Sequence, residues 1–230
     1  MNSEFDGFSK QCVRFFTDLK VNNNKIWFEQ HRSEYDTYVL QPARAFVVAL
    51  GERLTQISPG VVADPRTNKS LFRIHRDTRF SPDKSPYKLY MAIRFWEGMD
   101  PKMSPCYYFH LEPNKILLAA GLYRFPKEHL AEFRKSVVHP KHGPALVQAM
   151  ESVRENGKFD IEYKHYKRVP RGFDPEHELA EYLLYGGLTA HVWLDIPKAF
   201  YSSDLVDFCF ERYEQMAPLH MWLVGMTERL

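Results

Sequence analysis

Apolar side chains recur at helical spacing along the first quarter of the chain. Phe8 and Leu19 fall on one face of a first predicted helix. A run of three asparagines then interrupts the pattern, and Asn24 is predicted to be the N-cap of a second helix. Pro42 either kinks the next helical stretch or starts a new one, because proline cannot donate a hydrogen bond to the preceding turn. Helical periodicity continues until the stop signal at residues 58–60.

From residue 69 the pattern changes to short segments rich in aromatic and aliphatic residues, which is typical of strands. Pro113-Asn114 is a tight-turn signal, so the two strands that flank it are expected to form a hairpin. The predicted strands are residues 70–76, 87–96, 106–112 and 115–123.

The second half of the chain is predicted to be mostly helical, with helices at 127–138, 144–154 and 176–185. A loop with a short strand is expected at 164–175, a strand at 188–194, and one or two helices, interrupted at Pro218, in 198–230. This order predicts an α+β fold: a mainly antiparallel sheet flanked by N-terminal and C-terminal helices. We expect one domain, 1–230, with a helical part (1–60), a strand-rich core (69–123) and a mixed helical part (124–230).

Composition places the chain among ordinary globular proteins. Its 230 residues are 44% hydrophobic and 15% aromatic, which is enough to bury a sizeable core. Cys12, Cys106 and Cys209 fit neither a disulfide framework nor a CxxC metal pattern. The N-terminus shows no secretory signal, and no apolar run is long enough to span a membrane. We therefore expect a cytoplasmic protein that does not bind membranes.

The net charge of +2 is unevenly distributed. Residues 66–94 hold eight Lys or Arg against two acidic residues, whereas residues 174–230 hold ten acidic residues against three basic ones. The basic block peaks in the stretch RIHRDTRFSPDKSPYK, where arginine forks and lysine ammonium groups suit phosphate and carboxylate oxygens. The sequence therefore predicts an anion-binding site made of Arg73, Arg76, Asp77, Arg79, Lys84, Tyr87 and Lys88.

Within this stretch, Asp77 is expected to orient one arginine through a bidentate pair and to leave the other cations available for a ligand. Tyr87 is expected to donate a hydrogen bond to that ligand. The alternative is a set of structural salt bridges that pins the loop. The predicted site is favoured because five cations face only two acids, and charges without partners are costly to bury.

Secondary candidates lie elsewhere in the chain. Tyr108, His110 and Glu112 alternate on one face of a predicted strand, and His110 with Glu112 could serve as a general acid/base pair. An exposed sheet face with ordinary cross-strand pairs is the favoured interpretation of this pattern. Arg32 could join the basic site. Arg168 and Arg171 could cover it as a lid, although a solvated loop is favoured for that segment.

Several chemistries are not supported by motifs. His75-Arg76-Asp77 resembles a kinase catalytic loop, but position 82 is Pro where that mechanism needs Asn. No metal-ligand spacing, dinucleotide glycine pattern, Walker motif or nucleophile elbow occurs. We therefore predict no metal and no cofactor, and whether the protein is an enzyme remains open.

The stretch Arg73-x-x-Arg76-Asp77-x-Arg79-Phe80, followed by Lys84 and Tyr87, resembles the RxxRDxRF motif of the family DUF2461, also called TIGR02453. Other parts of the chain fit that family's layout, including residues 23–32, 121–123 and 167–173. The resemblance covers nearly the whole chain and implies a bacterial intracellular protein. It brings no activity with it.

The favoured hypothesis is a pocket that binds a phosphorylated or otherwise anionic small molecule, with metal-independent transfer or hydrolysis as its chemistry if it is an enzyme. One alternative is a nucleic-acid-binding module in which the same cations follow phosphates and exposed aromatic rings stack on bases. The other is a purely structural motif in a protein that acts through partner contacts.

Overall fold

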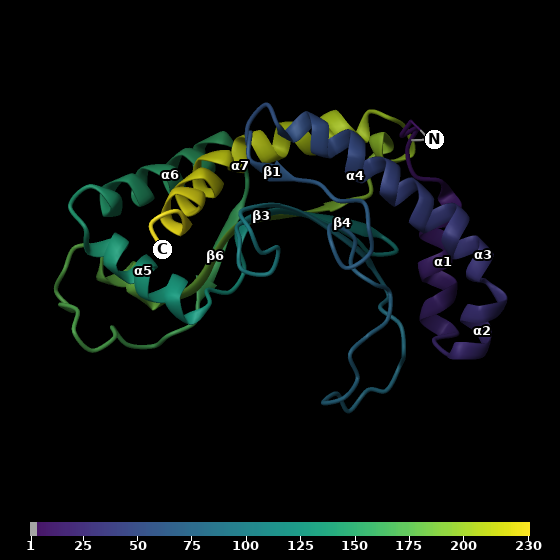
Figure 1. The fold of residues 1–230 in the computed structure, drawn as a ribbon, viewed down its shortest axis with the longest axis horizontal. Helices are drawn as coiled ribbons and strands as arrows, with labels where there is room; N and C mark the ends of the chain where they lie inside the picture. The colour runs from purple at the N-terminus through teal and green to yellow at the C-terminus, as the bar shows by residue number, and fades with distance from the viewer. Residues whose placement is uncertain (1–3) are drawn as a thin grey trace. The chain divides into compact units, whose positions relative to one another are not determined.

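The computed structural model describes residues 4–230 (Figure 1). Helices form both ends of this stretch and strands form its middle, so the predicted α+β class is confirmed. The helices are α1 (Lys10–Val21), α2 (Lys25–Gln30), α3 (Arg32–Glu34), α4 (Gln41–Leu54), α5 (Lys127–Val138), α6 (His142–Asn156) and α7 (Leu205–Thr227), with a π-helical segment at Tyr35–Leu40 and 3-10 turns at Ala180–Leu184 and Lys198–Tyr201.

Local capping explains where the first helices begin. The Ser9 hydroxyl accepts a hydrogen bond from the Cys12 amide at the start of α1. The Asn24 side chain accepts one from the Trp27 amide at 3.0 Å, which confirms Asn24 as the N-cap of α2. Pro42 stands in the first turn of α4, where its missing N–H is not needed.

The described strands form a six-stranded sheet in the order β1-β2-β3-β4-β6-β5. Strands β3 and β4 are neighbours joined by the short connection at residues 112–114, so the predicted hairpin is confirmed. β5 pairs antiparallel with β6, with Asp160 opposite His191. The strands are β1 (Val61–Val62), β2 (Met91–Glu97), β3 (Cys106–Leu111), β4 (Lys115–Leu122), β5 (Asp160–Lys164) and β6 (Tyr185–Asp195).

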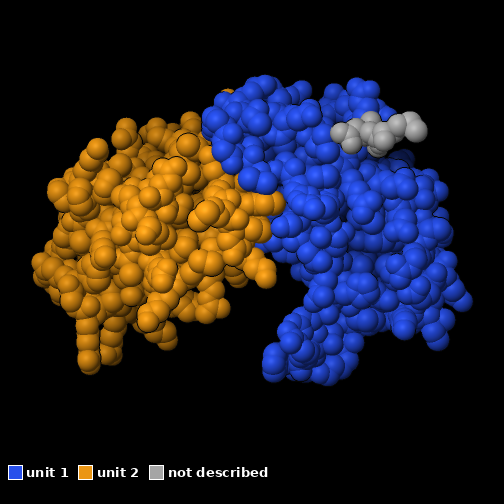
Figure 2. Space-filling model, viewed as in Figure 1, with its two compact units in different colours: residues 1–95, 108–118, 193–211 blue, residues 96–107, 119–192, 212–230 orange. Residues whose placement is uncertain are grey.

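The described chain divides into two compact units, coloured separately in Figure 2. The first contains residues 4–95, 108–118 and 193–211, and the second contains residues 96–107, 119–192 and 212–230. Several strands and α7 contribute to both units, because the boundaries fall inside these elements. The expectation of a single domain stays a prediction.

Each unit has its own aromatic core. In the first, Phe46 of α4 packs edge-on against Phe109 of β3 with ring centroids 5.1 Å apart, and Phe8 stacks on Phe200 at 5.0 Å. Helix α4 therefore covers one face of β3 in this unit. In the second unit, Phe133 of α5 contacts Phe125 at 4.7 Å. These rings are almost completely removed from solvent.

Several predicted elements differ from the observed ones. The helix expected at 176–185 is only a 3-10 turn at Ala180–Leu184, and Tyr185 already begins β6. Residues 70–76 do not form a continuous strand, because Phe72 bonds to Ala92 of β2 whereas Arg76 already bonds to the chain that returns after the loop. Helix α7 continues through Pro218 instead of stopping there. Its buried residues on both sides of the proline hold it in the helical path, and packing overrides the local breaker. They are Tyr213, Met216, Leu219 and Leu223.

Candidate functional site

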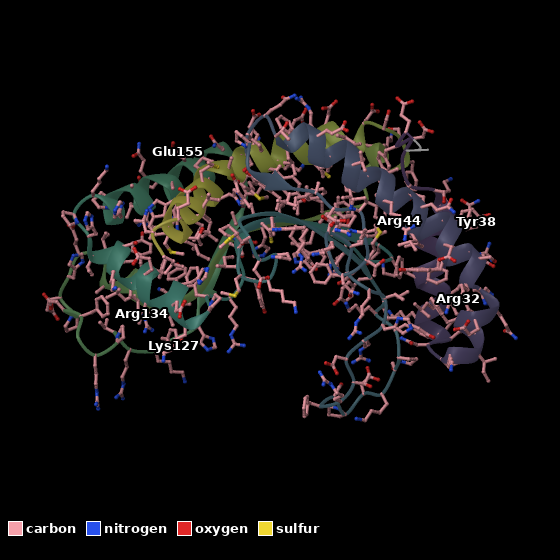
Figure 3. The ribbon with its side chains drawn as sticks, in the orientation of Figure 1. Arg32, Tyr38, Arg44, Lys127, Arg134 and Glu155 are labelled. Carbon is pink, nitrogen blue, oxygen red and sulfur yellow. The ribbon has the colours of Figure 1, made fainter. Side chains whose placement is uncertain are left out.

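The predicted anion-binding stretch forms an arm, residues 73–88, that projects from the sheet (Figure 1). In the sequence, the arm lies between β1 and β2. Its two limbs pair with each other at the base: the Arg76 amide donates to Pro86 O at 2.9 Å, and the Lys88 amide donates to Ile74 O at 2.8 Å. The side chains along it end mostly in nitrogen and oxygen (Figure 3). The arm therefore holds its charged groups on a short two-stranded base.

Asn23 and Phe28 attach the returning limb to the N-terminal helices. The Asn23 side chain donates to Tyr87 O at 2.9 Å and accepts from the Tyr87 amide at 3.1 Å. The Tyr87 ring stacks on Phe28 with centroids 4.2 Å apart and is only 3% exposed. Burial raises the pKa of the Tyr87 phenol. In this structure Tyr87 therefore anchors the arm, and its donation to a ligand stays a prediction.

Both carboxylates of the arm are paired with arginines. Arg79 donates to the two oxygens of Asp77 at 2.9 and 2.7 Å, so the expected bidentate pair is present. Hydrogen bonding from Arg79 lowers the pKa of Asp77 to about 2. The pair is exposed, so it orients these side chains more than it stabilises the fold.

Arg76 is held from several sides. Its guanidinium pairs with Asp83 and donates to Ser85 O at 3.1 Å. Asp83 in turn accepts from the Ser85 amide and hydroxyl, and these bonds together with Arg76 lower its pKa to about 2. The guanidinium is therefore fixed in place, and it is also half-buried.

The other three cations of the arm have no carboxylate partner among residues 4–230. Lys84 donates to Thr78 O and Lys88 donates to Arg73 O, each at 2.9 Å. The Arg73 guanidinium is exposed and has no hydrogen-bond partner within the described part of the chain. Burial, followed by the nearby Arg73 charge, lowers the pKa of Lys88. The arm therefore keeps uncompensated positive charge.

A cavity of about 460 Å³ opens at the base of the arm. This volume is in the range of pockets that hold small molecules. Two cations of the predicted site, Arg76 and Lys88, line it together with the paired carboxylates. Its lining residues are Asn23, Arg76, Asp77, Asp83, Ser85, Tyr87, Lys88, Leu89 and Tyr90. Arg73, Arg79 and Lys84 belong to the same arm but do not line this cavity.

A row of polar side chains that contact one another begins at the cavity. Tyr90 lines the cavity and stacks on His110 with centroids 4.4 Å apart. His110 Nδ1 lies 3.1 Å from the Tyr108 hydroxyl, and its Nε2 lies 3.4 Å from Glu112. Burial lowers the pKa of His110 even though Glu112 opposes this effect. In its neutral form the ring donates from Nε2 to the carboxylate and accepts from Tyr108 at Nδ1.

The remaining secondary candidates are not among the residues that line the cavity. Arg32, labelled in Figure 3, forms a bidentate pair with Glu29 at 3.0 and 2.8 Å. Arg168 and Arg171 are exposed in the segment between β5 and Ala180–Leu184, which belongs to the second compact unit. Their predicted roles as part of the anion site and as a lid stay predictions.

Five residues that line the cavity were not part of the predicted site: Asn23, Asp83, Ser85, Leu89 and Tyr90. Tyr90 could have been found, because it stands two positions after Lys88 in the strand predicted at 87–96 and would be expected on the same side. Asn23 lies 64 residues from Tyr87 in the sequence, and only the fold brings the two together.

Two kinds of feature are absent from residues 4–230. No group of three or more His, Cys, Asp or Glu side chains is arranged to hold a metal ion there. In the same range, no helix combines the length and the apolar character needed to cross a bilayer.

Comparison with known proteins gives the chain a family. No curated protein matches it. Residues 11–222 match the family model described as "Conserved hypothetical protein (DUF2461)", and this range includes the whole arm and all the residues that line the cavity. Since the match covers nearly the entire sequence, the chain belongs to the DUF2461 family.

Proposed function

We propose that the cavity at the base of the arm binds a phosphorylated or otherwise anionic small molecule. The observation that carries this proposal is that Lys88 lines the cavity and has no carboxylate partner among the described residues. Arg73 and Lys84, on the same arm, also lack one within residues 4–230. An anion would supply the missing counter-charge.

Arg76 and Lys88 have complementary roles in this proposal. Asp83 and Ser85 O hold the Arg76 guanidinium in place, so little entropy is lost when it binds a ligand oxygen. The Lys88 ammonium uses one proton on Arg73 O and has two left to donate. Because burial disfavours the charged form of Lys88, a bound anion is expected to raise the pKa of this lysine.

The other residues of the predicted site act on the arm itself. Asp77 orients Arg79, and Tyr87 anchors the returning limb. Arg73, Arg79 and Lys84 contribute to the positive field that attracts the ligand. If the bound molecule reacts, fixed cations of this kind stabilise negative charge that develops during transfer or hydrolysis.

We also propose a cytoplasmic location. Cys12, Cys106 and Cys209 form no disulfide within residues 4–230, and Cys12 and Cys209 are buried in the core. Cysteines that are not in disulfides are typical of proteins kept in a reducing compartment.

The test is isothermal titration calorimetry with inorganic phosphate and pyrophosphate on the full chain and on Lys88→Met. Methionine keeps an unbranched apolar stem against the neighbouring rings but removes the charge, so the fold should persist while affinity falls roughly tenfold, as for one lost charge-assisted bond. Arg14→Met, an exposed position on α1, is the matched control and should bind like the parent. Absence of heat with both anions, or equal binding by Lys88→Met, would overturn the proposal.

A nucleic-acid ligand is the second candidate, because of the tip of the arm. Phe80 is 92% exposed there, and the Arg79 guanidinium lies 5.8 Å from its ring centroid. An exposed ring among cations is what single-strand binding uses. The dependence of affinity on salt distinguishes the two candidate ligands. Affinity for an oligonucleotide would fall steeply between about 50 and 200 mM salt and would depend on Phe80.

A further inference from the structure

A set of aromatic side chains in the first compact unit, called here the ring face, continues outward from the cavity. Phe72 and Trp193 are its exposed members, at 37% and 41%. Large apolar side chains are usually buried more deeply, so two exposed rings on the same patch require an explanation. The ring face consists of Phe72, Tyr90, Tyr108, His110 and Trp193.

The ring face and the cavity share residues. Tyr90 lines the cavity and stacks on His110. The His110 and Trp193 rings meet edge to face, with centroids 5.7 Å apart. Lys88 also lines the cavity, and its ammonium lies 5.4 Å from the Phe72 centroid and 5.9 Å from that of Tyr90. A molecule with its anion beside Lys88 would therefore have aromatic surface next to its remaining part.

The exposed rings are held in position before any ligand arrives. The Arg94 guanidinium lies 4.9 Å from the Phe72 centroid, and Tyr108 meets the same ring edge-on at 6.0 Å. The Lys115 ammonium lies 4.0 Å from the Trp193 centroid. Rings that are already oriented lose little freedom when they stack on a ligand, which favours binding.

We infer that the ring face receives the flat ring of the same molecule whose anionic group the cavity holds, so that the ligand class is a phosphate ester of an aromatic or heteroaromatic compound, such as a nucleoside monophosphate. This inference rests on the proposed anion-binding function. A phosphorylated sugar or inorganic phosphate satisfies the cations of the cavity but leaves the exposed rings unused.

The inference predicts how tightly adenosine monophosphate, ribose 5-phosphate and adenosine bind in calorimetry, and inorganic phosphate is the probe for the anion-binding cavity alone. Stacking on aromatic side chains should make adenosine monophosphate bind about tenfold more tightly than ribose 5-phosphate. Adenosine alone should bind most weakly, because it lacks the group that Lys88 and Arg76 recognise.

The variants Phe72→Leu and Trp193→Leu test the ring face directly. Leucine keeps an apolar side chain but removes the aromatic face, so at least one of the two variants should lose the advantage of adenosine monophosphate while binding ribose 5-phosphate like the parent. The matched control is Tyr201→Leu, which removes a ring that is 42% exposed outside the ring face, and it should leave the ranking unchanged.

The outcomes separate this inference from the proposed function. If adenosine monophosphate and ribose 5-phosphate bind equally, or if both leucine variants keep the difference, the ring face is not part of the site and anion binding still stands. If none of the phosphorylated probes binds, the proposed function fails and this inference fails with it.

Discussion

At the scale of single residues, Asn23 attaches the arm to the N-terminal helices. Its one side chain satisfies both the amide and the carbonyl of Tyr87. Tyr87 is buried, and a backbone group left without a partner in such a place costs free energy. An asparagine amide is well suited to this position, because it carries a donor and an acceptor side by side.

We therefore expect Asn23→Ala to loosen the arm more than it destabilises the protein as a whole. Loss of the two hydrogen bonds should cost about 1–3 kcal/mol at the base of the arm. Hydrogen exchange should become faster at the Arg76 and Lys88 amides, which bond across that base. Asn22→Ala is the control, because within residues 4–230 the Asn22 side chain bonds only to Asp18 O of the preceding helix. Unchanged protection in Asn23→Ala would show that the stacked rings alone hold the arm.

At the scale of elements, features set by neighbours in the sequence were predictable, and features set by packing were not. The Asn24 cap and the turn between β3 and β4 depend on a few adjacent residues, and both are confirmed. The strand expected at 70–76 and the break expected at Pro218 are wrong, because contacts with distant segments decide them.

The same division applies to the candidate site. Composition alone located the basic arm, since so many cations with so few acids in sixteen residues is a local property. It did not show that Arg76 pairs with Asp83, or that Tyr90 connects the cavity to His110. Those relations depend on how the arm folds back on itself and on which strand follows β2 in the sheet.

The contact between β4 and β6 gives a prediction at this scale. Gly121 has a φ of +134°, and a Cβ there would lie 2.3 Å from Leu188 O. Gly121→Ala therefore combines a backbone conformation that only glycine adopts easily with a clash against the neighbouring strand. We expect the free energy of unfolding in urea to fall by about 3 kcal/mol or more.

Gly172→Ala separates the two effects in that prediction. Gly172 also has a positive φ, +91°, but a Cβ there would meet nothing within 4 Å. Its substitution should cost only the backbone strain, about 1 kcal/mol. If both variants lose the same stability, the close approach of β4 and β6 at Gly121 adds nothing.

At the scale of the whole molecule, buried histidines couple folding to pH in both compact units. His110 lies in the first unit, and His129 and His220 lie in the second. Burial lowers the pKa of all three below the ordinary value of 6.5. His220 is fully buried, stacks on Tyr107 at 4.1 Å and lies 3.2 Å from a Glu97 oxygen.

The sign of the pH effect follows from these shifts. Near pH 6 the unfolded chain takes up protons at histidines that stay neutral in the folded protein, so acid favours unfolding. The stability that the protein gains by burying these histidines in their neutral form is complete above pH 6.5. It is lost as the pH falls towards the lowered pKa values. Each such histidine contributes a slope of up to about 1.4 kcal/mol per pH unit.

His220→Gln tests whether the deepest of these groups dominates the acid sensitivity. Glutamine can still donate to Glu97 but cannot take up a proton, so the variant should lose stability at pH 7.5 through imperfect packing and yet show a flatter pH dependence between pH 6.5 and 5. Urea unfolding across this range measures both quantities. His165→Gln, at an exposed position, should keep the slope of the parent. If His220→Gln keeps the slope of the parent, His220 does not cause the acid sensitivity. Other groups must then cause it, and His110 and His129 would be the next histidines to replace.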